Sequence, residues 1–121
     1  MNKRIIFVTG TRADFGKLKS LIIETSMVKE FDVYIFITGM HNNPKYGNTY
    51  LEVQRLKNVK FKRFKNETNG ETMDLNLSNT INGFSAYVSK INPDLIVVHG
   101  DRPEPLACSI VGSFRNILVA H

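Results

Sequence analysis

RIIFVTG, at residues 4–10, is an apolar run rich in branched side chains that ends at a glycine. Such a run is typical of a strand that is buried on both faces of a parallel sheet. The same pattern returns in DVYIFITG (32–39) and DLIVVHG (94–100), and a last apolar run, ILVAH, fills residues 117–121. Recurrent buried strands that end in glycine or a polar residue indicate an α/β protein.

Between these strands, apolar residues recur at helical spacing, which predicts helices there. A helix follows the first strand, with Asp14 placed to cap it or to begin it. Another helix is stopped by Asn92-Pro93, and the next begins at Pro103, since proline is tolerated in a first helical turn. A short helix at about 49–56 and an alternating strand at 59–64, VKFKRF, complete the predicted elements.

Strands that alternate with helices need crossover connections, so we expect a parallel sheet with helices on both faces. The predicted fold is a three-layer, Rossmann-like α/β domain over residues 1–121, with the strand order 3-2-1-4-5. Ligands of such sheets bind beyond the carboxyl ends of the strands. Polar segments stand at four of these ends and should converge on one crevice: Thr9–Arg12, Thr38–His41, His99–Arg102 and His121.

The composition fits a single soluble domain. Of the 121 residues, 42% are hydrophobic and 22% are charged, and no stretch approaches the ~20 apolar residues of a membrane span. The lone Cys108 cannot form an internal disulfide, which favours the reducing cytoplasm. The net charge of +5 suits an anionic ligand. The basic residues form no helical stripe, however, and their densest cluster, Lys57–Lys65, is typical of the wet face of a strand, so we expect no nucleic-acid partner.

The segment TGTRADFGKLKS (9–20) has the outline of a phosphate-binding loop. A Walker A loop, G-x-x-x-x-G-K-[ST], spaces its glycines more closely and puts Ser or Thr where this chain has Leu18, and a dinucleotide fingerprint needs a third glycine. The segment therefore fits an anion site at a helix start, where the Arg12 guanidinium can donate two parallel hydrogen bonds and the Lys17 ammonium supplies a point charge. The structural alternative is that both are surface residues on a turn.

HGDR (99–102) is the sharper signal. Gly100 permits a tight exit from the strand, and Asp101 would face the crevice, where a carboxylate can act as a general acid or base. The alternative is that Asp101 caps the next helix and pairs with Arg102. The polar loop with His41 and Asn48 could contact sugar hydroxyls, or could be an ordinary surface loop.

The three histidines are not spaced as a zinc motif, and the lone cysteine adds no thiolate partner, so we expect no metal.

Four segments in combination resemble one family: TRADFGKL (11–18), GMHNNPKYGNTY (39–50), NPDLIVVHGDRPE (92–104) and ILVAH (117–121). They are similar to the amino-terminal domain of UDP-N-acetylglucosamine 2-epimerases, and nearer to the hydrolysing branch that feeds sialic-acid synthesis. Related hydrolysing enzymes act on bacillosamine-type sugars for legionaminic acid.

The resemblance implies one half of a GT-B-like fold, with the substrate in a cleft between two Rossmann-like domains. It implies conversion of UDP-N-acetylglucosamine and water to N-acetylmannosamine and UDP, without a cofactor. By resemblance, Arg12 and Arg102 contact the diphosphate, Gly16 and Lys17 line the same pocket, and Asp101 is an acid/base carboxylate. The loop that carries His41 and Asn48 would lie over the active site.

This chain departs from the family after its last strand. The family continues beyond the strand-end histidine with I-E-G-G-E or similar, whose Glu is a second catalytic carboxylate, whereas this chain ends at His121. We therefore expect a truncated half without the carboxyl-terminal UDP-binding domain, inactive alone, with a possible homo-oligomer or a second chain as partner. The alternatives are a stand-alone nucleotide-sugar-binding module and half of a GT-B glycosyltransferase.

Overall fold

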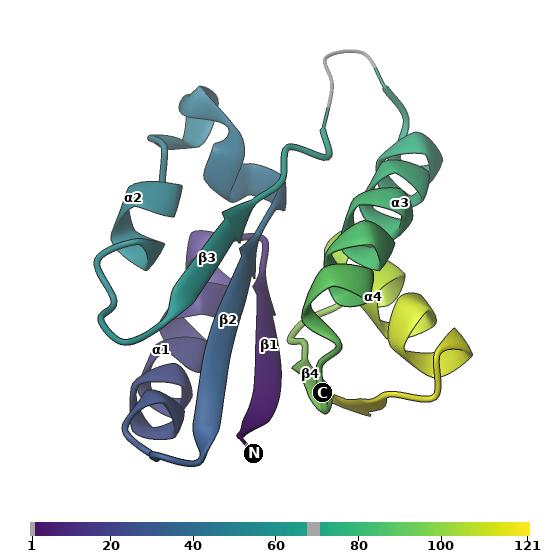
Figure 1. Cartoon of the computed structure of the whole chain (residues 1–121). Coiled ribbons are helices and arrows are strands. Elements are labelled where there is room, and N and C mark those ends of the chain that lie inside the picture. Colours follow the sequence, from purple (N-terminus) through teal and green to yellow (C-terminus); the bar gives the residue numbers. More distant parts are fainter. Residues whose placement is uncertain (1, 68–70) are drawn as a thin grey trace.

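The structure is a computed structural model that describes residues 2–67 and 71–121 (Figure 1). Its strands and main helices alternate along the chain. The strands are β1 (Lys3–Thr9), β2 (Phe31–Ile37), β3 (Lys60–Arg63), β4 (Leu95–Val97) and β5 (Leu118–Ala120). The helices are α1 (Arg12–Ser26), α2 (Tyr50–Val53), α3 (Met73–Ile91) and α4 (Pro103–Phe114), with two 3₁₀ turns, η1 (Gly39–Asn42) and η2 (Pro44–Tyr46).

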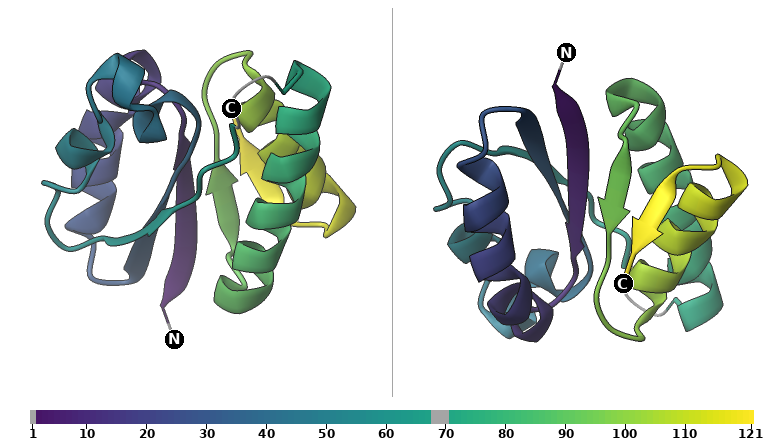
Figure 2. Two further views of the ribbon diagram at one scale, coloured as in Figure 1. Left: turned by 90° about the horizontal axis from the view of Figure 1, so that it is seen from above. Right: turned by 90° about the horizontal axis from the view of Figure 1, so that it is seen from below.

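All the strand pairs are parallel, and their order across the sheet is β3-β2-β1-β4-β5. The predicted order and the predicted α/β class are therefore confirmed. Figure 2 shows β1 and β4 side by side in the middle of the molecule, with a helical layer on each side. Because strand order reverses between β1 and β4, the loops after these two strands diverge and leave room for a ligand.

Alternate side chains of the central strands point to opposite faces of the sheet and pack into two separate hydrophobic cores. Ile5 and Phe7 pack with Phe15 and Ile22 of α1, together with the buried residues of β2 that share their face. Ile6 and Val8 point the other way and pack with the buried faces of α3 and α4, including Phe84, Val88, Cys108 and Val111. The strands are therefore buried on both faces, and the sheet is the middle of three layers.

The start of α1 is fixed by a reciprocal capping box. The Thr11 side chain accepts from the Asp14 backbone N–H, and the Asp14 side chain accepts from the Thr11 backbone N–H. Asp14 thus lies in the first turn, as predicted, but the N-cap residue is Thr11 and Asp14 is the third residue of the helix. The helix expected near residues 49–56 is shorter, at Tyr50–Val53. Asn48 adopts a left-handed backbone conformation and limits the helix at its start.

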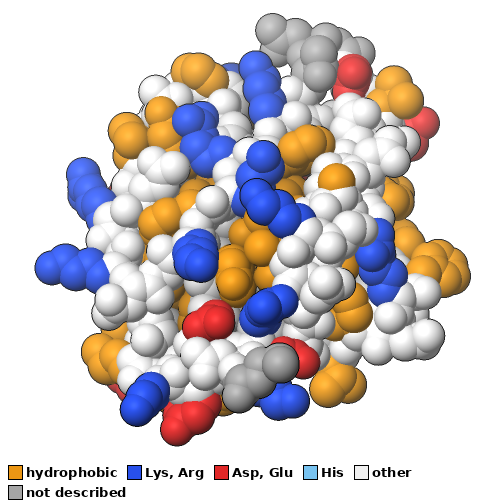
Figure 3. Space-filling view, in the orientation of Figure 1, with side chains coloured by type: hydrophobic (Ala, Val, Ile, Leu, Met, Phe, Trp, Pro, Cys, Tyr) orange, Lys and Arg blue, Asp and Glu red, His pale blue; other side chains and the backbone are white. Residues whose placement is uncertain are grey.

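The edge strand β3 carries its basic residues outward. Lys60, Lys62 and Arg63 are exposed and Phe61 is half-buried, which is the wet strand face predicted from the alternation. Figure 3 shows Lys and Arg side chains spread over the face that carries β3 and α3, with hydrophobic atoms between them. Charged side chains at a sheet edge discourage pairing with another chain. Within the described residues, no helix is long and apolar enough to cross a membrane.

Candidate functional site

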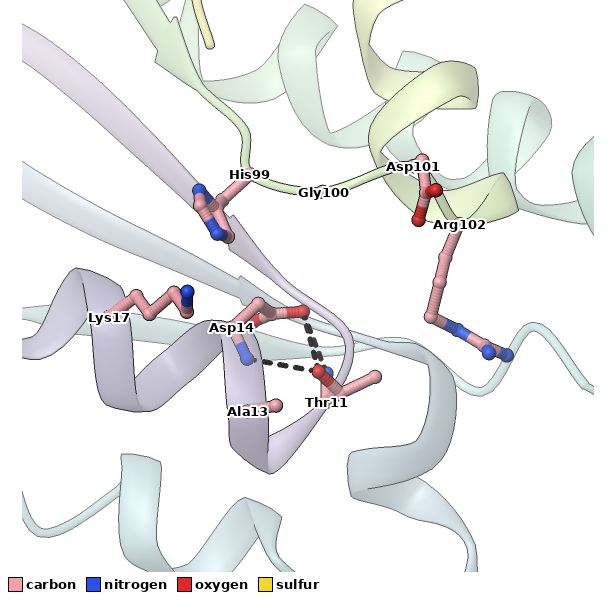
Figure 4. Close-up of a pocket in the computed structure, with 8 residues that line it drawn as sticks. All are labelled: Thr11, Ala13, Asp14, Lys17, His99, Gly100, Asp101 and Arg102. Atoms are coloured by element: carbon pink, nitrogen blue, oxygen red, sulfur yellow. Dashed lines mark hydrogen bonds between the residues drawn. The ribbon is translucent and has the colours of Figure 1, made fainter.

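A pocket of about 180 Å³ lies where the start of α1 meets the loop between β4 and α4 (Figure 4). It is at the carboxyl ends of the adjacent strands β1 and β4, the position predicted from the fold. Its lining residues come from those two loops and the first turns of the helices: Thr11, Ala13, Asp14, Lys17, His99, Gly100, Asp101 and Arg102. Three of the predicted site residues, Lys17, Asp101 and Arg102, therefore line one pocket.

Asp14 also lines this pocket, but its carboxylate is occupied by the protein. Its Oδ2 accepts from the backbone N–H groups of Gly10, at 3.1 Å, and Thr11, at 2.9 Å, and from the Thr11 hydroxyl at 3.0 Å. Its Oδ1 accepts from the Thr9 hydroxyl. These four hydrogen bonds use the acceptor positions of the carboxylate, which leaves it little capacity to meet a substrate. Asp14 therefore shapes the loop after β1.

His41 continues this hydrogen-bonded chain into the interior. It is completely buried, with Nε2 at 2.8 Å from Thr9 Oγ1 and Nδ1 at 2.9 Å from Thr49 Oγ1. The Thr9 hydroxyl gives its proton to Asp14, so it accepts from His41 Nε2–H, and the Thr49 hydroxyl then donates to Nδ1. Burial lowers the pKa of His41 more than the charges of Asp14 and Glu52 raise it, which keeps the ring neutral.

The sequence placed His41 at the substrate, and the structure places it beneath the surface, as the link between the loops after β1 and β2. Its side chain is completely buried, and its contact with a substrate stays a prediction.

Asp101 is exposed at the rim of the pocket, and the structural alternative for it is not realised. The N-cap of α4 is Arg102, and that helix start has no side-chain capping hydrogen bond. Among the described residues, the carboxylates within salt-bridge distance of Arg102 belong to Glu67 and Glu104, not to Asp101. Asp101 is therefore a carboxylate at the pocket that neither caps the helix nor pairs with its neighbour.

Arg102 extends from the far side of the pocket, and in Figure 4 its guanidinium points away from Lys17. Its Nε lies 3.5 Å from Glu104 Oε1, and its Nη2 lies 3.9 Å from Glu67 Oε1. Glu104 is buried in the first turn of α4, a position that its sequence neighbours, two prolines, do not reveal. Burial and the nearby charge of Glu104 raise the pKa of Glu67, against the opposing effects of Arg102 and a hydrogen bond with Asn43.

Asn66 joins this cluster to the sheet, and all of its side-chain hydrogen-bonding capacity is used. Its Oδ1 accepts from the Thr38 hydroxyl at 3.0 Å and from Gly39 N–H at 2.8 Å. Its Nδ2 donates to Thr80 Oγ1 at 2.8 Å and to Glu104 Oε2 at 3.0 Å. One amide thus connects the end of β2 with α3 and α4, a role that nothing in the local sequence of Asn66 indicates.

The remaining predicted residues lie outside the pocket lining. Arg12 is on the exposed side of the first turn of α1, where its Nη2 lies 3.4 Å from Glu52 Oε1 of α2. Gly16 is exposed one turn further along α1, and open space surrounds the position of an added Cβ. Asn48 adopts a left-handed conformation in the turn before α2. Their contacts with a substrate stay predictions.

Comparison with known proteins identifies a family. A sequence model of the family described as UDP-N-acetylglucosamine 2-epimerase matches residues 24–121. The chain is 43% identical, over 98% of its length and 32% of the relative's, to UDP-N-acetylglucosamine 2-epimerase of Neisseria meningitidis serogroup B. It is 31% identical, over its full length and 33% of the relative's, to the hydrolysing UDP-N,N'-diacetylbacillosamine 2-epimerase of Legionella pneumophila.

Solved structures agree. The UDP-GlcNAc 2-epimerase of Methanocaldococcus jannaschii, crystallised with UDP-GlcNAc and UDP, superimposes with a TM-score of 0.79 at 27% identity, covering 98% of this chain and 32% of that one. The chain thus spans about a third of the length of the relatives that it matches, and corresponds to one part of their GT-B-like fold. Because the family model covers most of the sequence and the fold agrees with it, the chain belongs to the UDP-N-acetylglucosamine 2-epimerase family.

Proposed function

We propose that this chain is the amino-terminal, sugar-side domain of a hydrolysing UDP-N-acetylglucosamine 2-epimerase, and that residues 1–121 form one Rossmann-like unit of a two-domain enzyme. The proposal is supported by the names of two relatives, one a UDP-N-acetylglucosamine 2-epimerase and the other a hydrolysing 2-epimerase of UDP-N,N'-diacetylbacillosamine. It is also supported by their roughly threefold greater length. The proposed reaction converts UDP-N-acetylglucosamine and water to N-acetylmannosamine and UDP in the cytoplasm.

The proposed chemistry needs a base, a stabilised leaving group and a proton donor. A carboxylate takes the proton from C2 of the sugar while the bond between C1 and the UDP oxygen breaks, which leaves a C1–C2 double bond and releases UDP. Water then adds at C1, and a proton returns to C2 from the opposite face. Departure of the diphosphate is assisted by cations that neutralise its developing negative charge.

Asp101 is the residue we assign to one of the two proton transfers. The observation that carries this assignment is the contrast between two carboxylates of the same pocket. Asp14 accepts four hydrogen bonds from the protein, whereas Asp101 is exposed and caps no helix. Lys17 supplies a positive charge to the same pocket, and Arg102 supplies another at its far side, both suited to the diphosphate.

Turnover by this chain alone is not expected. Removal of a proton from one face of C2 and return of a proton to the other normally need two positioned groups. Of the two carboxylates that line the pocket, Asp14 accepts hydrogen bonds from the protein, and Asp101 has no such partner within residues 2–67 and 71–121. The second group and the remaining contacts with UDP would be supplied by a further domain, whether it follows in the same polypeptide or is a separate chain.

Binding and proton exchange test the proposal together. The chain is titrated with UDP-N-acetylglucosamine by NMR and then incubated with it in D₂O. We expect saturable binding that Lys17→Ala weakens and Lys29→Ala, on the surface turn before β2, leaves unchanged. We expect no N-acetylmannosamine from this chain by itself. An affinity that Lys17→Ala leaves unchanged would overturn the assignment of the pocket. Binding without exchange of the C2 proton, even after a complementary second domain is added, would favour a non-catalytic sugar-nucleotide module.

A further inference from the structure

Glu104 is a buried charge whose position is unexplained by folding alone. Its side chain is 1% exposed, and its Oε2 accepts from Asn66 Nδ2 at 3.0 Å. Its Oε1 has no hydrogen-bond partner among the described residues, and neither has the buried Nε of Arg102, which lies 3.5 Å away. A buried carboxylate oxygen without a donor is costly, so a group placed in this way usually has a role beyond stability.

The two unpartnered atoms face each other. Arg102 Nε and Glu104 Oε1 lie 3.5 Å apart and form no hydrogen bond, and a small movement of the guanidinium would bring them within ordinary hydrogen-bonding distance. Glu67 Oε1 lies 3.9 Å from Nη2, on the same edge of the guanidinium. The Nε and Nη2 edge of Arg102 is therefore turned toward two carboxylates.

The backbone beneath Glu104 is built to receive its carboxylate. A Cβ at Gly10 would lie 3.2 Å from Glu104 Oε1, and a Cβ at Gly39 would lie 3.1 Å from the same oxygen. Glycine at the ends of β1 and β2 thus allows the carboxylate to reach the point where these strands end. Glu104 is therefore enclosed by the two loops, and Asn66 donates a hydrogen bond to its other oxygen.

We propose that Glu104 is a positioning residue for the nucleotide-sugar pocket. Its carboxylate attracts the Nε–H side of the Arg102 guanidinium and so sets the direction in which the rest of the guanidinium meets the diphosphate. The inference rests on the proposed function, since it assumes that Arg102 contacts the ligand. It adds a residue that does not line the pocket and acts through one that does.

The chemistry of the two partners explains why a carboxylate is required here. Asn66 Nδ2 and Arg102 Nε are both donors, and each needs its own acceptor. Glu104 offers one oxygen to each. A glutamine at this position has a single oxygen, so its amide group would turn N–H toward one of the two donors, and either Asn66 or Arg102 would be released.

A double-mutant cycle on binding of UDP-N-acetylglucosamine separates positioning from general stabilisation. The variants are Glu104→Gln, Arg102→Ala and the double variant, with Glu30→Gln, an exposed residue before β2, as the matched control. We expect Glu104→Gln to weaken binding about tenfold in the wild-type background, which corresponds to a typical coupling between contacting residues, and to have almost no effect once Arg102 is Ala. Equal weakening in both backgrounds would overturn the proposal, because Glu104 would then act independently of Arg102. Tighter binding by Glu104→Gln would also overturn it, since the carboxylate would then compete with the diphosphate for Arg102.

The NMR signal of the Arg102 Nε–H group reports on the contact without any ligand. Glu104→Gln should shift this signal and speed its exchange with water, and Glu30→Gln should change neither. An unchanged signal in folded Glu104→Gln would refute the contact. If the wild-type chain does not bind the nucleotide sugar, the proposed function fails, and the Nε–H signal alone then decides whether Glu104 holds Arg102.

Discussion

Replacing Asn66 with Asp should destabilise the fold in a way that depends on pH. The substitution keeps the shape of the side chain but replaces Nδ2, which donates to Glu104 Oε2 at 3.0 Å, with an acceptor oxygen. Asn66 and Glu104 are both 1% exposed, so two carboxylates would meet in the interior. At about 3 Å and an effective dielectric constant of about 20, two full charges repel by roughly 5 kcal/mol, so the pair would keep one proton.

The retained proton determines how much stability the variant loses and how that loss changes with pH. The pKa of the pair in the folded variant would lie above the value near 4 of an unfolded carboxyl, so the folded state binds more protons and the stability of the variant falls as pH rises. Between about pH 4 and pH 7 the cost grows at up to about 1.4 kcal/mol per pH unit, which gives an upper limit of about 4 kcal/mol at neutral pH. Arg102 next to Glu104 lowers this value.

The assay is urea unfolding of wild type and variant between pH 4.5 and pH 8, compared at each pH. Asn66→Ala is the first control: it loses the same hydrogen bonds at a cost of about 2 kcal/mol, but its deficit should depend on pH less than that of Asn66→Asp because it adds no second carboxylate. Asn82→Asp, on the exposed side of α3, is the second control and should change stability little. A deficit of Asn66→Asp that is no larger at pH 8 than at pH 5 would refute the reasoning.

Three further predictions concern burial and backbone shape. The free energy of unfolding of the wild type should rise as the pH rises from about 5 to 6.5, in part because the pKa of His41 is lowered in the folded state, so that the unfolded state binds more protons in this range. His41→Gln should remove this contribution, which urea unfolding at pH 5 and pH 7.5 would measure. Gly39→Ala should cost about 2–3 kcal/mol, since φ is +60° and the new Cβ would lie 2.7 Å from Gly10 O, whereas Gly47→Ala, with φ +86° and open space, should cost only about 1 kcal/mol in the same thermal melts. Phe84→Ala should cost about 3–5 kcal/mol because its ring is completely buried, and Phe114→Ala, at a ring that is 86% exposed, should change the unfolding midpoint little; similar losses at both positions would contradict the assignment of the core.

The sheet could be predicted from the sequence because its signal is local and repeated. Each of the runs beginning at Ile5, Val33 and Leu95 is apolar on both faces and closes at a polar loop, and parallel crossovers leave few topologies. The sequence predicted the helices, but it did not predict which of their apolar residues are buried. Leu106 and Phe114 continue α4 at helical spacing but are largely exposed, since helical spacing shows which residues share a face and not whether another element covers it.

The candidate site could be predicted only in its outline. Asp101 and Arg102 follow β4, and Lys17 lies in the second turn of the helix that follows β1. The fold brings the ends of these two strands together, so the meeting of these residues at one pocket followed from topology. The resemblance grouped Arg12 with them, but its guanidinium pairs with Glu52, since the first turn of α1 presents it to α2 and not to the pocket. Glu104 and Asn66 were missed because their importance lies in contacts between residues 38 positions apart, which no local pattern encodes.

The most direct test of the account is the position of the nucleotide sugar on this chain. Backbone amide signals are followed by NMR during titration with UDP-N-acetylglucosamine at neutral pH. The account predicts that the largest changes fall on Lys17, Gly100, Asp101 and Arg102, at the ends of β1 and β4. Changes centred instead on the pocket formed by Lys62, Tyr87 and Lys90, between β3 and α3, or no saturable change at all, would contradict it.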